Sequence, residues 1–303
     1  MRNAGIEQKL EDLFFITLNP PIDGFENFIG VWLKTGTPAY LVDVGPTVTI
    51  PDLIEALDGL KVKRLDYIFI THIHMDHAGG IGEFAKRFTE TPIIVHKAAI
   101  PHLIDPSKLW SGSLKTLGDM ARAYGPLSGV GADRLLDAEQ FAGENIKPII
   151  TPGHAPHHIS LMTPQCLFAG ETCGVHLSLP DGKHYLRPAT PPKFFLDTAI
   201  SSIERLEEHK PHHICFGHHG MEPNGVRWLK THKEQLIAWK ALIEEEMGAK
   251  ISENVIAGCI DRLKREDPML AHFDVLSSGE KDRENYFISN SIKGFMGYIE
   301  SMS

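Results

Sequence analysis

The chain of 303 residues is predicted to fold as a mixed α and β protein with a wholly helical C-terminal region. Up to about residue 225, apolar runs that suit buried strands alternate with helix-like segments. Beyond that residue, apolar side chains recur only at helical intervals. The composition, 42% hydrophobic and 23% charged, is that of an ordinary globular protein, and the length permits a substantial core.

The first elements expected along the chain are three strands and a helix. Residues 14–18, 28–33 and 39–42 are apolar runs separated by turns that contain Pro, Gly and Asp. Residues 51–57 open with a proline, which favours the first turn of a helix. Residues 65–70 form a further apolar run, which predicts a buried strand.

The segment that follows this strand carries four side chains able to bind metal. In extended chain, alternate side chains point the same way, so His72 and His74 can reach one ion. Asp76 and His77 lie farther along, where the chain must turn into a helix near residues 79–80, and they therefore point elsewhere. The spacing predicts two adjacent metal positions, and imidazole with carboxylate suits zinc, iron, manganese or cobalt.

Three later apolar runs also end in residues that can bind metal. The first run stops at a Pro-Gly break and presents His154, and the second ends in the carboxylate of Glu171. The third turns at Gly217 and presents His218. If that turn is shifted by one residue, His219 takes the place of His218.

The pattern HxHxDH with Gly-Gly behind it, followed in order by TPGH, FAGE and GHHG, resembles the metallo-β-lactamase superfamily. The resemblance spans residues 12–225, and it is closer to hydroxyacylglutathione hydrolases (glyoxalase II) and lactonases than to antibiotic-destroying members. It implies a four-layer αββα sandwich with two divalent metal ions at one edge. Carried over to this chain, the ligand groups are His72, His74 and His154 for one ion, and Asp76, His77 and His218 for the other.

Two carboxylates accompany these ligands in the resemblance. Glu171 falls where the family usually has a bridging aspartate. Because glutamate is one methylene longer, Glu171 could bridge both ions, bind one, or turn away, which leaves the second position open. Asp43 matches a carboxylate behind the ligands, where it would orient a ligand histidine or cap a buried turn.

The function that the resemblance implies is metal-dependent hydrolysis of thioesters, lactones or other esters by metal-bound hydroxide. Asp76 would be the catalytic residue, because it can bind metal and also accept a proton. Zinc is the first expectation, with iron or manganese as alternatives, since several ions accept these ligands. An iron-dependent oxidoreductase of the persulfide dioxygenase type and a phosphodiesterase are the alternative functions.

The sequence also predicts how the chain is organised. Residues 1–225 form the metal-binding catalytic domain, and residues 226–303 form a C-terminal helical region. Apolar side chains at helical spacing in residues 105–126 indicate a helical insertion, which would either act as a lid or simply pack. The long C-terminal helices offer a surface for a homodimer.

Charge and cysteine usage limit the partners. The net charge of −9, with no basic stripe, opposes nucleic-acid binding, so a small-molecule substrate is expected. No apolar segment approaches the roughly 20 residues needed to cross a bilayer, and the start of the chain lacks an apolar signal sequence. We therefore expect a cytoplasmic protein whose four cysteines, without CxxC spacing, stay reduced.

Overall fold

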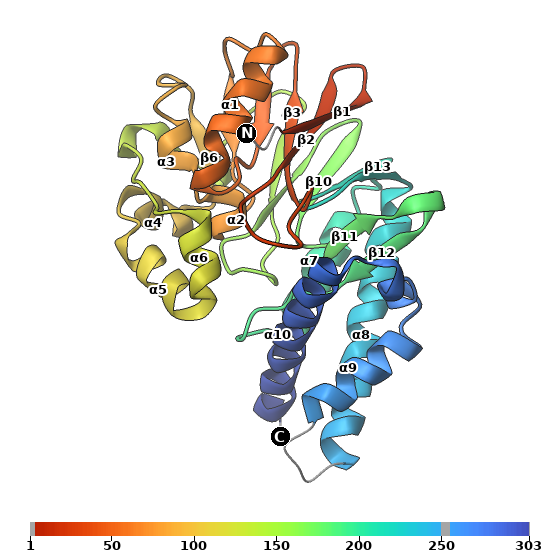
Figure 1. Cartoon of the computed structure of the whole chain (residues 1–303). Coiled ribbons are helices and arrows are strands. Elements are labelled where there is room, and N and C mark those ends of the chain that lie inside the picture. Colours follow the sequence, from red (N-terminus) through yellow and green to blue (C-terminus); the bar gives the residue numbers. More distant parts are fainter. Residues whose placement is uncertain (1–3, 250–254, 303) are drawn as a thin grey trace.

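Two β-sheets packed face to face form the upper part of the molecule, and helices project below them (Figure 1). The structure is a computed structural model that describes residues 4–249 and 255–302. The larger sheet has the order β1-β2-β3-β4-β5-β6-β7. Its strands are β1 (Gly5–Leu10), β2 (Leu13–Leu18), β3 (Ile29–Lys34), β4 (Tyr40–Val42), β5 (Tyr67–Phe69), β6 (Ile93–Val95) and β7 (Leu135–Asp137).

The second sheet has five strands in the order β14-β13-β10-β9-β8. They are β8 (Lys147–Ile150), β9 (Ile159–Met162), β10 (Cys166–Gly170), β13 (His213–Phe216) and β14 (Met221–Pro223). Between β10 and β13 the chain makes a separate antiparallel hairpin of β11 (Val175–Ser178) and β12 (His184–Arg187).

Aromatic side chains from both sheets fill the space between them. Phe15, Trp32 and Phe69 come from the larger sheet and Phe168 from the smaller one, and all four are buried. The Trp32 indole N–H donates a hydrogen bond of 2.9 Å to the carbonyl of Phe216, which ties the two sheets together. Face-to-face packing with alternating inward side chains is the usual core of two stacked sheets.

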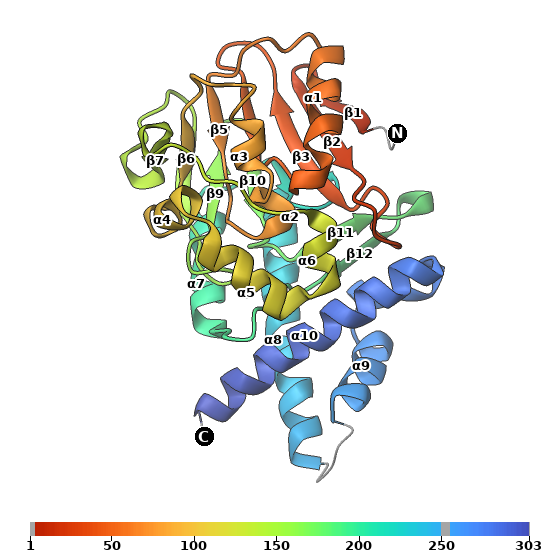
Figure 2. The same ribbon diagram turned by 60° about the vertical axis from the view of Figure 1, so that its left-hand side comes forward.

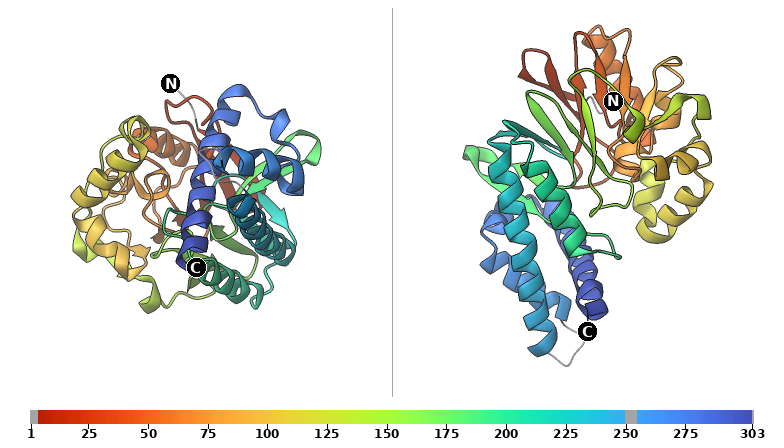
Figure 3. Two further views of the ribbon diagram at one scale, coloured as in Figure 1. Left: turned by 90° about the horizontal axis from the view of Figure 1, so that it is seen from below. Right: turned by 180° about the vertical axis from the view of Figure 1, so that it is seen from behind.

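Helices cover the outer faces of the sheets, as Figure 3 shows from two sides. A second, larger core cluster lies between sheets and helices. The four layers αββα that the resemblance implies are therefore present. The helices are α1 (Ile50–Gly59), α2 (Met75–Ala78), α3 (Ile81–Phe84), α4 (Ile100–Ile104), α5 (Ser107–Leu117), α6 (Asp119–Tyr124), α7 (Leu196–Glu207), α8 (Gly225–Ala249), α9 (Val255–Glu266) and α10 (Ser278–Met302).

The metal-binding motif folds into helix earlier than the sequence predicts. We expected a helix to begin near residues 79–80, but α2 begins at Met75, so Asp76 lies in its first turn. The glycine pair instead separates α2 from α3. A Cβ at Gly80 would lie 2.3 Å from Cδ1 of Ile50, so glycine at this position lets the motif pack closely against α1.

The C-terminal helices α8, α9 and α10 pack on one another and extend away from the sheets. In the view of Figure 2, α10 crosses the molecule below α5 and α6. Among the described residues, none of the helices is both long and apolar enough to span a bilayer. The four cysteines are free and buried, which confirms the prediction of reduced thiols.

Candidate metal centre

The first group of candidate ligands comprises three histidines and a glutamate from three loops. His72 and His74 follow β5, His154 follows β8, and Glu171 directly follows β10. Nε2 of His154 lies 2.8 Å from Nδ1 of His74 and 2.7 Å from Oε2 of Glu171. One nitrogen or oxygen of each of the four residues lies within 4.8 Å of the others, so together they can surround one ion.

The second group lies beside the first and contains Asp76, His77 and His218. Oδ2 of Asp76 lies 3.8 Å from Nε2 of His77 and 3.7 Å from Nε2 of His218. The neighbouring His219 does not join this group, because its ring packs edge-on against Phe15 at 5.7 Å. Of the two histidines that the sequence leaves open, the structure thus brings His218 to the centre.

Glu171 contacts both groups. Its Oε2 lies 3.3 Å from Nε2 of His72 and 3.6 Å from Nε2 of His77, while its Oε1 lies 3.2 Å from Nε2 of His218. Of the three arrangements that the extra methylene allows, the structure shows the one in which the carboxylate reaches both groups.

Each of four ligand rings is oriented by a contact at its other nitrogen. Such outer contacts fix the ring and decide which nitrogen carries the proton. They leave Nε2 of each ring free to face the centre. The contacts from Nδ1 are His72 to the Thr71 hydroxyl (3.1 Å), His77 to Asp43 (2.9 Å), His154 to the Ala189 carbonyl (2.8 Å) and His218 to the Phe28 carbonyl (3.2 Å).

Asp43 is the buried carboxylate of this outer layer. Besides His77, it accepts hydrogen bonds from the backbone N–H of Thr71 (2.8 Å) and from the Thr71 hydroxyl (2.8 Å). It is only 2% exposed. Asp43 therefore makes the contact to a ligand histidine that the sequence predicts, and it also fixes the start of the motif.

His158 is a positioning residue that the sequence did not single out. Its Nε2 accepts a hydrogen bond of 3.1 Å from the backbone N–H of Glu171, and its Nδ1 faces the hydroxyl of Thr151 at 2.9 Å. The ring is fully buried. Two adjacent histidines after His154 were visible in the sequence, but nothing in their spacing told which one turns inward.

The electrostatics of the centre suit cations. Burial lowers the pKa of His72 and of His74 well below the usual value, which keeps both imidazoles neutral. Burial alone would also lower the pKa of His77, but the carboxylates of Asp76 and Asp43 raise it to about 10. A positive charge is thus favoured at this position.

The donor atoms of both groups are able to hold metal ions. Nε2 of His72 and Nε2 of His77 are buried and have no hydrogen-bond partner among the described residues, an arrangement that is costly unless something binds there. The carboxylates of Glu171 and Asp76 stand beside them. Imidazole nitrogen with carboxylate oxygen is a donor set that zinc, iron and manganese accept.

A cavity of about 530 Å³ opens over these ligands. Its floor includes His74, Asp76, His154, Glu171 and His218. One wall comes from α5 and α6 and another from α10, which stand on opposite sides in Figure 1. The apolar lining residues include Met75, Leu109, Leu117, Met120 and Phe287.

Comparison with known proteins agrees with this fold and motif. The model of the metallo-beta-lactamase superfamily matches residues 27–218, which is more than half of the chain. The chain belongs to the metallo-β-lactamase superfamily.

Three known proteins are similar to the chain. The metallo-beta-lactamase fold-containing protein ST1585 of Sulfurisphaera tokodaii is 28% identical over 235 residues, or 75% of this chain and 83% of the relative. Its crystal structure matches 95% of this chain and 99% of its own with a TM-score of 0.68 and 22% identity. An N-acyl homoserine lactonase of Bacillus cereus is 31% identical over 56% of this chain and 62% of the lactonase. A hydroxyacylglutathione hydrolase of Yersinia enterocolitica is 26% identical over 47% of this chain and 46% of the relative.

Replacing Asp43 with asparagine is expected to weaken zinc binding by about 10- to 100-fold, the usual effect of removing an outer partner of a ligand histidine. The amide keeps the size of the side chain but no longer holds His77 by a charged contact. A competition titration with a chromophoric chelator measures the affinity. Asp58→Asn, an exposed change on α1, is the matched control. Wild-type affinity in Asp43→Asn would show that Asp43 only supports the turn.

Proposed function

We propose that the protein is a metal-dependent hydrolase of lactones, thioesters or other esters whose acyl part is apolar. One observation carries this proposal: two metal-competent ligand groups that share Glu171 form the floor of a cavity with apolar walls. Superfamily members are mostly hydrolases. A small-molecule substrate suits the cavity size, because pockets of roughly 300–1,000 Å³ hold ligands of that kind.

The residues of the cavity floor would have different roles in hydrolysis. Divalent ions, when bound, supply Lewis-acid polarisation of a carbonyl and lower the pKa of water toward neutrality. Asp76 lines the cavity, and its side chain is 20% exposed, more than the neighbouring His77 and His218. Oδ2 of Asp76 is therefore placed to accept the proton of an attacking water.

The apolar walls set the preference for the acyl part. Side chains of α5, α6 and α10, among them Leu109, Met120 and Phe287, would cover an alkyl chain that extends from the reacting carbonyl. Each buried methylene contributes about 0.8 kcal/mol, which corresponds to roughly fourfold in kcat/KM. Specificity is then expected to rise with chain length until the cavity is full.

The relatives support the same class of reaction. The Bacillus cereus relative is named for an N-acyl homoserine lactone, and the Yersinia relative for a hydroxyacylglutathione. Both names describe hydrolysis at an acyl carbon. The position of Glu171 between both ligand groups favours two metal ions over the single iron of a persulfide dioxygenase.

Metal analysis followed by a substrate panel tests this proposal. We expect at least two divalent ions per chain, zinc foremost, in protein purified without added metal. We expect p-nitrophenyl esters to be hydrolysed with kcat/KM rising about fourfold per methylene of the acyl chain, and N-acyl homoserine lactones to be hydrolysed at the lactone carbonyl. One iron per chain with oxygen uptake on glutathione persulfide would refute the proposal, and so would preference for bis(p-nitrophenyl) phosphate.

A further inference from the structure

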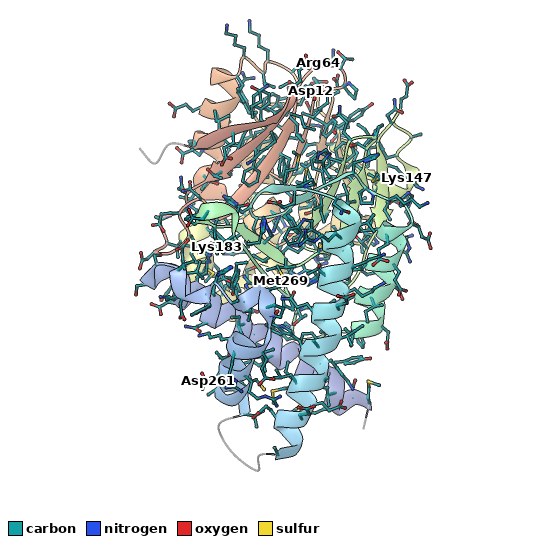
Figure 4. The ribbon with its side chains drawn as sticks, turned by 90° about the vertical axis from the view of Figure 1, so that its right-hand side faces the viewer. Asp12, Arg64, Lys147, Lys183, Asp261 and Met269 are labelled. Atoms are coloured by element: carbon teal, nitrogen blue, oxygen red, sulfur yellow. The ribbon has the colours of Figure 1, made fainter. Side chains whose placement is uncertain are left out.

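A third cluster of metal-competent side chains lies outside the cavity. His176 is on β11, His184 on β12 and Glu222 on β14. In the hairpin register His176 pairs with Leu186, while His184 pairs with Ser178, so the two histidines are diagonal neighbours on one face. The tip of this hairpin, marked by Lys183 in Figure 4, projects away from the sheets. None of the three residues of the cluster lines the cavity of the candidate metal centre.

Two of the three distances within this cluster are close to the edges of a tetrahedral metal site. Nε2 of His176 lies 3.1 Å from Nδ1 of His184, and this Nδ1 lies 3.6 Å from Oε1 of Glu222. All three atoms lie within 4.8 Å of one another. Zinc bonds of about 2.0–2.2 Å place neighbouring ligands of a tetrahedron roughly 3.3–3.5 Å apart.

The ring of His176 is held with Nε2 toward the cluster. Its Nδ1 donates a hydrogen bond of 2.8 Å to the carbonyl of His219, so Nε2 of the neutral ring carries a lone pair. The ring is fully buried and stacks on Phe216 at 4.3 Å. Burial lowers the pKa of His176 to about 3, which keeps the lone pair free of a proton.

Without an ion, one hydrogen bond joins the two histidines of this cluster, and the carboxylate of Glu222 stays outside it. Nδ1 of His184 faces two acceptors, Nε2 of His176 and the carboxylate of Glu222. A ring nitrogen carries at most one hydrogen, and it can donate that hydrogen to only one of the two acceptors. A cation among the three donor atoms would satisfy all of them together.

We propose that His176, His184 and Glu222 bind a third transition-metal ion, separate from the candidate metal centre. Two imidazoles and one carboxylate suit zinc, and a water can complete four-coordination. The side chains of His184 and Glu222 are 32% and 16% exposed, which gives an ion and a water access from solvent.

The bound ion would tie the β11–β12 hairpin to the edge of the five-stranded sheet. This hairpin ends at Arg187, which lines the cavity, and two residues later the carbonyl of Ala189 orients His154. The third ion therefore has a positioning role for one wall of the cavity. The proposal of this third site does not depend on the identity of the substrate or on the proposed function.

Zinc counting on chelator-stripped protein tests this site. The full chain and its variants are dialysed against zinc, exchanged into zinc-free buffer and analysed by elemental mass spectrometry. We expect His184→Ala and Glu222→Gln each to hold one zinc per chain fewer than wild type. His212→Ala, which removes an exposed histidine outside the cluster, should keep the wild-type number.

A variant of the main centre separates the two sites. His74→Ala should lose zinc from the main centre but keep the equivalent that His184→Ala removes, so the double variant should lose both. Equal zinc content in wild type, His184→Ala and Glu222→Gln would overturn the proposal. Circular dichroism checks that the variants fold. If His184→Ala fails to fold, the zinc content of Glu222→Gln decides the outcome, because this change is isosteric and lies on the partly exposed strand β14.

Discussion

Replacement of Asp76 with asparagine is expected to lower kcat for ester hydrolysis by about 10²–10⁴, the range that a positioned general base contributes. Asparagine has the same size and can remain in the first turn of α2, but it cannot accept a proton. The loss should fall mainly on kcat, because the apolar cavity walls that bind the acyl chain are unchanged. Steady-state kinetics on the best ester of the panel measure it.

Asp76 also belongs to the second ligand group, so metal content must be measured in the same samples. If Asp76→Asn holds the wild-type metal content and still loses activity, the loss reports on proton transfer. Asp119→Asn on α6 is the matched control, because that carboxylate is fully exposed. A kcat within threefold of wild type at full metal content would exclude Asp76 as the base.

The candidate metal centre was largely predictable from the sequence, because its ligands follow the ends of apolar runs. Ends of neighbouring strands meet at one edge of a sheet, and a motif of four candidate ligands within six residues leaves little room for another interpretation. The prediction for Asp43 rested on the family resemblance, and its contact with His77 is present. The resemblance to a known family supplied the order of the sheets, which periodicity alone does not contain.

Other contacts of the centre could not be predicted from the amino-acid sequence. The groups that orient His154 and His218 are main-chain carbonyls of Ala189 and Phe28, which any residue could supply. The short strands β1, β9, β11, β12 and β14 were not predicted, because polar residues interrupt their apolar runs. The third cluster was missed for the same reason, because it exists only once β11, β12 and β14 lie together.

The cavity wall from α10 shows why tertiary structure must complete a functional prediction. Among the side chains of this helix, Tyr286 lines the cavity. Tyr298 instead donates a hydrogen bond to Asp197, and Lys293 is exposed. Helical periodicity identifies a buried face, but it does not tell whether a substrate or a neighbouring helix covers that face.

The buried carboxylate of Glu284 joins this helix to the rest of the molecule. It is fully buried between Arg187 of β12 and Arg283, with Arg283 Nε donating to its Oε1 at 2.8 Å and Arg187 Nε donating to its Oε2. Arg283 also stacks over the ring of Phe28 at 3.9 Å. Two buried guanidinium groups thus depend on a single carboxylate.

Glu284→Gln is therefore expected to lower the free energy of unfolding by about 3–5 kcal/mol, because it leaves buried cations without their counter-ion. Chemical denaturation measures the loss. Asp282→Asn, an exposed change two residues before Glu284 on α10, should stay within about 0.5 kcal/mol of wild type. A Glu284→Gln variant as stable as wild type would mean that the cluster adds nothing to folding.

The pH dependence of stability gives an independent test of Glu284. Burial raises the pKa of Glu284, but the charges of Arg187 and Arg283 outweigh it and hold the pKa below its usual value. A carboxyl whose folded pKa is lowered stabilises the fold above its unfolded pKa, about 4.3, and this stabilisation is lost as the pH falls through the folded value. Wild type should therefore lose stability on acidification below about pH 4.3. Glu284→Gln should lack that part of the loss, so its deficit relative to wild type should shrink as the pH falls.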